Sequence, residues 1–187
     1  MRIDRFILTG PPGSGKTTIL QQLAVEGFAT ADEAATDLIA EWQQRGIEEP
    51  WTDPSFLDAI VQMQRRRQVD LGSAARIQFY DRSPICTFAL AAWLQQPVSS
   101  ALRSEIARIR RKSIYRREVF FVRSLGFITP TEARRISLAD AIRFGELHEE
   151  AYLAHGFQLI HIDPAPIAQR VASIKRCLED LCEPAGH

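Results

Sequence analysis

The chain has 187 residues, of which 45% are apolar and 25% charged, and its 23 basic and 23 acidic residues give a formal net charge of zero. These are values of one ordinary globular domain, and they give no overall attraction to nucleic acid or an anionic membrane. The three cysteines form no C-x-x-C or zinc-ligand spacing, and no apolar run reaches the ~20 residues of a membrane span. We therefore expect a single cytoplasmic domain over residues 1–187, with free thiols, no signal peptide and no membrane partner.

Short apolar segments alternate with longer amphipathic segments along the chain. Strands are predicted at residues 6–9, 28–30, 77–80, 119–122 and 157–162. Helices, several of them opened by an N-cap residue followed by proline, are predicted at residues 17–25, 34–44, 53–71, 83–93, 100–114, 129–135, 137–154 and from 163 onward. Strands that alternate with helices form parallel sheets with right-handed crossovers. The expected fold is therefore α/β, a three-layer α/β/α sandwich with a five-stranded parallel sheet.

A glycine-rich segment joins the first predicted strand to the first helix. Residues 10–17 read Gly-Pro-Pro-Gly-Ser-Gly-Lys-Thr and match the P-loop pattern G-x-x-x-x-G-K-[ST] in full. Backbone N–H groups of such a loop converge on an anion, the lysine pairs with phosphates and the threonine hydroxyl suits Mg²⁺. The motif predicts a nucleoside triphosphate site formed by Gly10, Pro11, Pro12, Gly13, Ser14, Gly15, Lys16, Thr17 and Thr18. No N-K-x-D guanine signature is present, which favours ATP without excluding GTP.

Charged residues follow two of the other predicted strands. Asp81 follows the strand at 77–80, where an acid faces the ligand crevice and can hold Mg²⁺, or can simply cap the next helix. Arg82 comes next and can bind a phosphate or a substrate oxygen with two parallel N–H groups. Asp32 and Glu33 follow the second strand, where an acid can accept a proton from a substrate hydroxyl or stabilise a helix N-terminus. Of these two we prefer Glu33.

Two further segments are rich in arginine. Arg134 and Arg135 belong to a lid segment at about residues 126–137, which can close over the site and bring charge to a transferring phosphoryl group. The alternative is that both arginines are solvated. The stretch between residues 103 and 117 contains six arginines and Lys112, but only one acid, Glu105. This stretch is either a solvated helix face or a patch for an acidic partner or a phosphorylated substrate.

Weaker candidates are amides, aromatic rings and histidines of the predicted elements. Gln62 and Gln64 can read a base or a sugar, although an exposed helix surface is the favoured interpretation. Core packing is likewise preferred to substrate stacking for Trp42, Trp51, Phe56 and Trp93. The histidines, at positions 148, 155, 161 and 187, show no metal-ligand pattern.

Together these motifs resemble the family of NadR-type AAA ATPase/kinase domains. The resemblance covers nearly the whole chain and rests on the glycine-rich loop and on residues 32–41, 79–83, 132–137 and 151–160 in consistent order. It implies a nucleoside-kinase-like P-loop fold with Asp81 and Arg82 near the phosphates, Arg134 and Arg135 in a lid, and Glu33 preferred to Asp32. The chain departs from the family at Thr36, where members tend to carry arginine, so no role of that arginine carries over.

The expected activity is that of a small-molecule kinase, an ATP-dependent enzyme that acts on a nucleoside-like acceptor hydroxyl. In this interpretation Thr17 and Asp81 hold Mg²⁺, and Glu33 acts as base. Lys16 is expected to place its charge on the β- and γ-phosphates, and the residues expected to stabilise the transferring phosphoryl group are Arg82, Arg134 and Arg135. A rival is an ATPase or nucleotide-dependent switch that binds a protein or acidic partner, and a nucleic-acid-linked ATPase is least favoured. The sequence leaves the acceptor and the oligomeric state open, homo-oligomers included.

Overall fold

The fold is built on one fully parallel five-stranded sheet, seen in a computed structural model that describes residues 3–73, 75–127 and 136–182. The strands are β1 (Asp4–Thr9), β2 (Ala29–Ala31), β3 (Ile77–Asp81), β4 (Glu118–Val122) and β5 (Gln158–Ile162). Their order across the sheet is β2-β3-β1-β4-β5, and every neighbouring pair is parallel. The predicted fold class is confirmed, and each predicted strand boundary is correct to within two residues.

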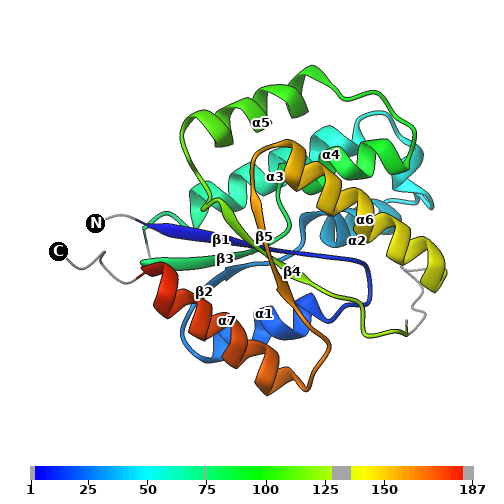
Figure 1. The fold of residues 1–187 in the computed structure, drawn as a ribbon. Coiled ribbons are helices and arrows are strands. Elements are labelled where there is room, and N and C mark those ends of the chain that lie inside the picture. The colour runs from blue at the N-terminus through cyan, green and yellow to red at the C-terminus, as the bar shows by residue number, and fades with distance from the viewer. Residues whose placement is uncertain (1–2, 74, 128–135, 183–187) are drawn as a thin grey trace.

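Helices cover both faces of this sheet. They are α1 (Lys16–Val25), α2 (Ala34–Gln44), α3 (Phe56–Asp70), α4 (Pro84–Trp93), α5 (Ser100–Arg111), α6 (Leu138–Ala154) and α7 (Ile167–Cys182), with a short 3-10 turn at Pro50–Thr52. Helices α1 and α7 lie side by side on one face, and α3 to α6 occupy the other (Figure 1). No helix within the described ranges has the length and hydropathy to cross a membrane.

The alternation of side chains along the central strand divides the core into two layers. Phe6 and Leu8 of β1 pack toward α1 and α7, whereas Ile7 between them packs toward α4, α5 and α6. The ring of Phe6 lies between those of Phe79 and Phe120, with centroids 5.9 and 5.6 Å away. Because the central strands are buried on both faces, the loops at their carboxyl ends start from a rigid base.

Two predicted helix starts and one helix end are wrong. Helix α3 begins at Phe56 rather than Asp53, because the Asp53 carboxylate accepts hydrogen bonds from N and Oγ of Ser55 at 2.8 and 2.7 Å in a local turn. Helix α7 begins at Ile167 rather than Asp163, since Pro166 disfavours a helical backbone at the residue before it. Helix α5 ends at Arg111, ahead of Ser113 with its φ of 46°. The predicted helix at 129–135 lies outside the described residues.

The backbone of Gly10 passes very close to β4. Its φ is 132°, and a Cβ atom at this position would lie 2.2 Å from the carbonyl oxygen of Val122. An alanine would have to displace the backbone at the carboxyl end of β4, a strand that pairs with the central strand β1. We therefore expect Gly10→Ala to lower the free energy of unfolding by about 3 kcal/mol or more, as measured by urea denaturation.

Gly46 offers a matched control, because it has a φ of 85° but a Cβ added at this position would meet nothing within 4 Å. The variant Gly46→Ala carries only the backbone strain, which costs about 1–2 kcal/mol. Equal losses in the two variants would contradict the proposed clash with β4.

Candidate active site

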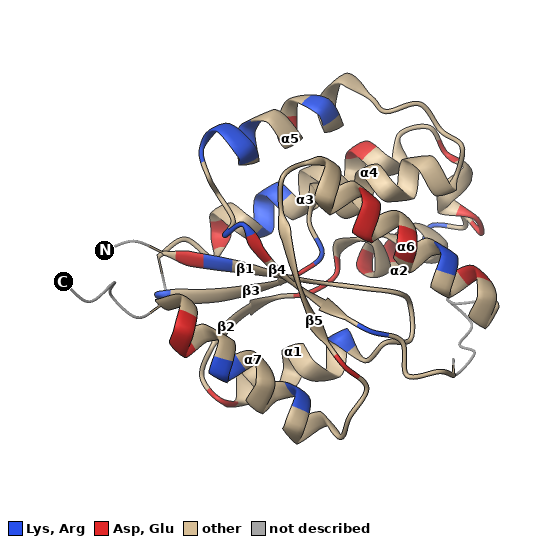
Figure 2. Ribbon diagram, in the orientation of Figure 1, with Lys and Arg blue, Asp and Glu red and all other residues tan. Residues whose placement is uncertain are grey.

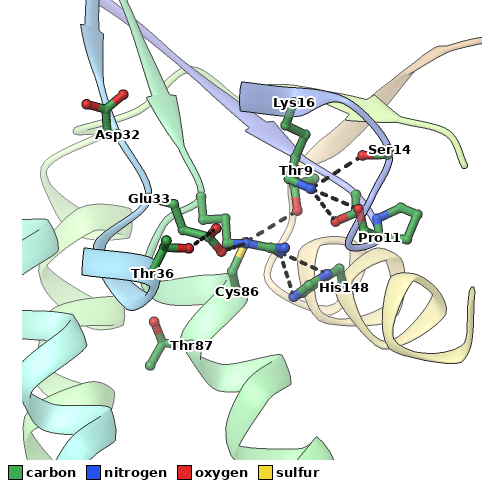
Figure 3. A network of polar contacts seen from close by, with 12 residues as sticks. Thr9, Pro11, Ser14, Lys16, Asp32, Glu33, Thr36, Cys86, Thr87 and His148 are labelled. Carbon is green, nitrogen blue, oxygen red and sulfur yellow. Dashed lines mark hydrogen bonds and ion pairs between the residues drawn. The ribbon is translucent and has the colours of Figure 1, made fainter. Parts of the chain in front are cut away.

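The glycine-rich loop wraps tightly between β1 and α1. Ser14 N donates to the carbonyl oxygen of Pro11 at 3.3 Å, and Gly15, with a φ of 85°, forms the N-cap of α1. The Lys16 ammonium folds back over this loop and donates to the carbonyl oxygens of Gly10 and Pro11 at 3.1 and 2.9 Å (Figure 3). It also reaches Oγ of Ser14 at 3.3 Å. The lysine charge is thus held over the loop, where the dipole of α1 also favours an anion.

Asp81 stands beside this loop at the carboxyl end of β3. It is opposite Leu8 in the register of β1 and β3, and N of the next residue, Arg82, donates to Leu8 O at 3.0 Å. The Asp81 side chain is buried, while Thr17 is exposed at the start of α1. Hydroxyl and carboxylate oxygens are the donors that Mg²⁺ prefers, and this ion is commonly held by one or two carboxylates together with substrate phosphates. Thr17 and Asp81 therefore fit the predicted metal chemistry.

A second cluster joins the loops that follow β2 and β3. Arg82, with a φ of 72°, donates through Nε to the carboxylate of Glu33 in a half-buried ion pair (Figure 3). The other carboxylate oxygen of Glu33 accepts a hydrogen bond from Thr36 Oγ1 at 2.8 Å. Arg82 Nη1 lies 3.2 Å from Nε2 of His148 on α6. Asp32 is exposed and points away from this cluster, so the structure brings Glu33 and not Asp32 beside Arg82.

The charges of this cluster set its protonation states. Burial opposes the charge on Glu33, but Arg82, Lys16 and the bond from Thr36 lower the pKa of its carboxyl to about 2. Burial likewise opposes the charge on Arg82, and Glu33 nevertheless raises the pKa of Arg82 above its ordinary value. Burial, Arg82 and Lys16 all hold the pKa of His148 well below its usual range. The imidazole is therefore neutral near pH 7 and can accept the hydrogen bond from Arg82.

A cavity of about 960 Å³ opens next to this cluster, between α2, α3, α4 and α6. Pro12 of the glycine-rich loop, Glu33 and Arg82 line it, and Thr87 Oγ1 donates to Oε1 of the buried Gln64 at 3.2 Å on its wall. Its aromatic lining consists of Trp51, Phe56, Trp93 and Phe144. Cavities of ~300–1,000 Å³ with apolar walls and a few fixed polar groups are typical small-molecule sites.

The structure corrects several weaker expectations from the sequence. Gln62 is exposed as expected, but Gln64 is buried and lines the cavity rather than a helix surface. The aromatic rings assigned to the core also line the cavity, except Trp42, which packs against Phe56 with ring centroids 5.7 Å apart. Sequence reasoning gave no role to His148. The spacing of Phe144, His148 and Tyr152 at i, i+4 and i+8, on one face of α6, was the available signal.

Of the two arginine-rich segments, the structure describes the one between residues 103 and 117 but not the arginines of the other. Arg134 and Arg135 lie outside the described residues. Within the basic stretch, Arg108 pairs with Glu105, and Arg116 pairs with Asp4 and Glu118. The exposed cations of α5 and the turn after it are Arg103, Arg110, Arg111 and Lys112 (Figure 2).

The parallel sheet and the phosphate loop define the class of this protein as a P-loop NTPase fold. The sequence model that describes the AAA domain family matches residues 5–170 of the chain. The chain therefore belongs to this family. A comparison with curated proteins found no match.

Solved structures share the fold at low sequence identity. A NadR protein in complex with NAD and AMP-PNP is 15% identical with a TM-score of 0.68, and the match covers 99% of this chain and 51% of that chain. Deoxyadenosine kinase from M. mycoides with bound dATP is 14% identical with a TM-score of 0.60, and the match covers 94% of this chain and 99% of that one. The chain thus spans about half of the NadR protein and nearly all of the deoxyadenosine kinase. The chain therefore shares its fold with these P-loop proteins.

The ion pair between Glu33 and Arg82 makes stability depend on pH. Because the pKa of Glu33 lies at about 2, below its ordinary 4.5, the contribution is present above pH 4.5 and is lost as the pH falls toward 2. We expect Glu33→Gln to lower the free energy of unfolding near neutral pH by roughly 1–3 kcal/mol and to flatten its acid dependence. Urea denaturation at a series of pH values measures both effects.

Glu41 provides the matched control, because it pairs with Arg45 on the exposed surface of α2. Exposed pairs at this spacing contribute little to stability, so Glu41→Gln should change neither the neutral value nor the acid slope appreciably. An unchanged acid slope in Glu33→Gln would contradict the assigned ion pair.

Proposed function

We propose that this protein is a kinase that transfers the γ-phosphoryl group of Mg·ATP to a hydroxyl group of a small, nucleoside-like acceptor. The observation that carries the proposal is the position of the Glu33–Arg82 pair, which lines the large cavity together with Pro12 of the phosphate loop. A molecule in the cavity can therefore place a hydroxyl between this pair and a phosphate held by the loop. Such a placement is the main requirement of phosphoryl transfer, where catalysis is largely positioning and electrostatic stabilisation.

In the proposed reaction the triphosphate takes the place of the carbonyl partners of Lys16. The lysine then pairs with the β- and γ-phosphates, and backbone N–H groups of the loop bind the remaining oxygens. Thr17 and Asp81 would hold Mg²⁺, which supplies charge neutralisation on the phosphates. Arg82 contributes positive charge at the acceptor side, and Arg134 and Arg135 remain proposed partners of the transferring group.

Glu33 acts on the acceptor hydroxyl. A carboxylate with a pKa of about 2 is a weak base, so it does not remove the proton in advance. Its role is to accept a hydrogen bond from the hydroxyl, to aim the oxygen at phosphorus, and to take the proton as the new bond forms. Arg82 holds the carboxylate in place through its Nε bond, and the neutral His148 holds Arg82 from the other side.

The cavity favours a nucleoside-like acceptor. Its aromatic walls suit a planar ring, and Thr87 fixes the amide of Gln64 where it can hydrogen-bond a polar ring edge. The solved structures with this fold include a deoxyadenosine kinase with bound dATP and a NadR protein with AMP-PNP. These relatives support a nucleotide donor and an acceptor of nucleoside size.

A nucleotide-dependent switch is the second candidate, favoured by the exposed basic residues of α5. Measurement of ADP release from Mg·ATP, with and without a panel of nucleosides and other small hydroxyl compounds, separates the two. A kinase releases ADP at a rate that depends on one class of acceptor. Slow release that no acceptor changes, together with nucleotide-dependent binding of an acidic partner, would favour the switch.

The first variant tests the phosphate loop. Removal of the Lys16 ammonium takes away a charge-assisted bond to the phosphates, so Lys16→Ala should lower affinity for Mg·ATP at least about tenfold with the fold intact. Calorimetric titration gives the affinity, and circular dichroism checks the fold. Lys112→Ala, at an exposed position after α5, is the matched control and should bind like wild type. Equal affinities in Lys16→Ala and wild type would be incompatible with a nucleotide site at this loop.

The second variant tests the acceptor side. Glu33→Gln cannot take the hydroxyl proton, so acceptor-dependent ADP release should fall about 100-fold while Mg·ATP still binds. The neighbouring exposed acid provides the control, and Asp32→Asn should keep the wild-type rate. Loss of turnover in Asp32→Asn but not in Glu33→Gln would reverse the assignment.

A further inference from the structure

An arginine of α7 lies behind the phosphate loop. Arg170 is only 3% exposed, although it belongs to the first turn of a helix that packs on α1 (Figure 1). Its Nη2 donates to the carbonyl oxygen of Ser14 at 2.7 Å. Its Nη1 lies against Gly15, where an added Cβ would be 2.9 Å from that nitrogen. The backbone of the loop and the guanidinium are therefore in direct contact.

Within the part of the chain that the structure describes, no acidic side chain balances the charge of Arg170. Among the described residues no carboxylate forms an ion pair with it, and its buried Nε has no hydrogen-bond partner. Desolvation lowers the pKa of its guanidinium below the ordinary value. A buried cation without a counter-ion destabilises a fold, and a methionine of similar length would cost less. The packing of α7 alone therefore gives no reason for an arginine at this position.

The contact with Ser14 fixes the orientation of one peptide unit. The C=O and N–H groups of a trans peptide point in opposite directions, and the described chain has no cis peptide bonds. Because Arg170 holds the Ser14 carbonyl toward α7, the N–H of Gly15 points away from α7. It therefore faces the side of the loop opposite α7, where the phosphates are proposed to bind. A charged donor on the carbonyl also polarises the peptide and makes its N–H a stronger donor.

We propose that Arg170 is a positioning residue for the bound polyphosphate, because it turns the Gly15 N–H toward the phosphates and its own charge is balanced by theirs. The inference rests on the proposed nucleotide site. It also gives a second reason, besides φ, for glycine at position 15, since a side chain there would force the guanidinium to shift from its place against the loop.

The test compares three variants by calorimetric titration with Mg·ATP and with inorganic tripolyphosphate, which lacks the nucleoside. Arg170→Met removes the charge and the donor at nearly constant length, and its affinity for both probes should fall about tenfold. Arg170→Lys keeps the charge and one donor, so it should recover part of the loss. Arg176→Met, at an exposed position on the same helix, is the matched control and should bind both probes like wild type.

Two further readouts separate positioning from a merely structural role. In Arg170→Met the Gly15 amide resonance should shift in the nucleotide-free protein, and the KM for ATP should rise while the KM for the acceptor stays constant. If Arg170→Met does not fold, Arg170→Lys carries the test, with about threefold weaker binding expected for a single donor in place of a fork.

The possible failures are distinguishable. Wild-type protein that binds neither probe would overturn the proposed nucleotide site and this inference with it. Wild-type binding together with unchanged affinity in the folded Arg170 variants would overturn the inference alone. Loss of affinity for Mg·ATP but not for tripolyphosphate would also overturn it, because the effect would then concern the nucleoside rather than the phosphates.

Discussion

The site depends on the parallel pairing of β1 with β3. This pairing places Leu8 opposite Asp81, and the hydrogen bond from Arg82 N to Leu8 O continues the ladder past the end of β3. The phosphate loop and the Asp81–Arg82 dipeptide therefore leave the sheet at the same edge and side by side. Because β2 pairs with β3 in the same direction, Glu33 arrives there as well. The packed core fixes these positions before any ligand contributes.

Two cations lie at this edge of the sheet, Lys16 and Arg82, and each has partners within the protein. Lys16 uses backbone carbonyls, and Arg82 uses Glu33 and a neutral His148. Backbone carbonyls compensate the charge of an ammonium less well than phosphate oxygens do. Replacement of the carbonyl partners of Lys16 by phosphate oxygens would therefore favour the binding of a triphosphate. The Glu33–Arg82 pair is already complete, and its acid resists protonation far below neutral pH. In the proposed function, the loop around Lys16 would thus gain charge compensation on binding, while the Glu33–Arg82 pair is preorganised.

The sequence predicts those parts of the site that follow directly from strand ends. The phosphate loop, Asp81, Arg82 and Glu33 each lie at the carboxyl end of a strand or within two residues after it, so the strand pattern alone brings them to one edge. Gln64, His148 and Arg170 sit instead on helices, and their direction depends on how each helix is rotated against the sheet. That rotation results from packing over long sequence separations, which no local pattern records. Two predicted helix starts were wrong for a related reason. The local turn at Asp53 delays the start of α3, and Pro166 delays the start of α7.

The surroundings of Glu33 differ from those that the family resemblance implies, because position 36 is a threonine. The resemblance places an arginine at this position in related domains, where it would add a second cation next to Glu33. Here Thr36 supports the carboxylate through one neutral hydrogen bond of 2.8 Å, and the charge of Glu33 is balanced by Arg82 and Lys16 instead. Thr36 itself lines the cavity, and a threonine adds less bulk and no positive charge there compared with an arginine. In the proposed function, this difference would alter which acceptor fits while the phosphate loop and the acid stay in place.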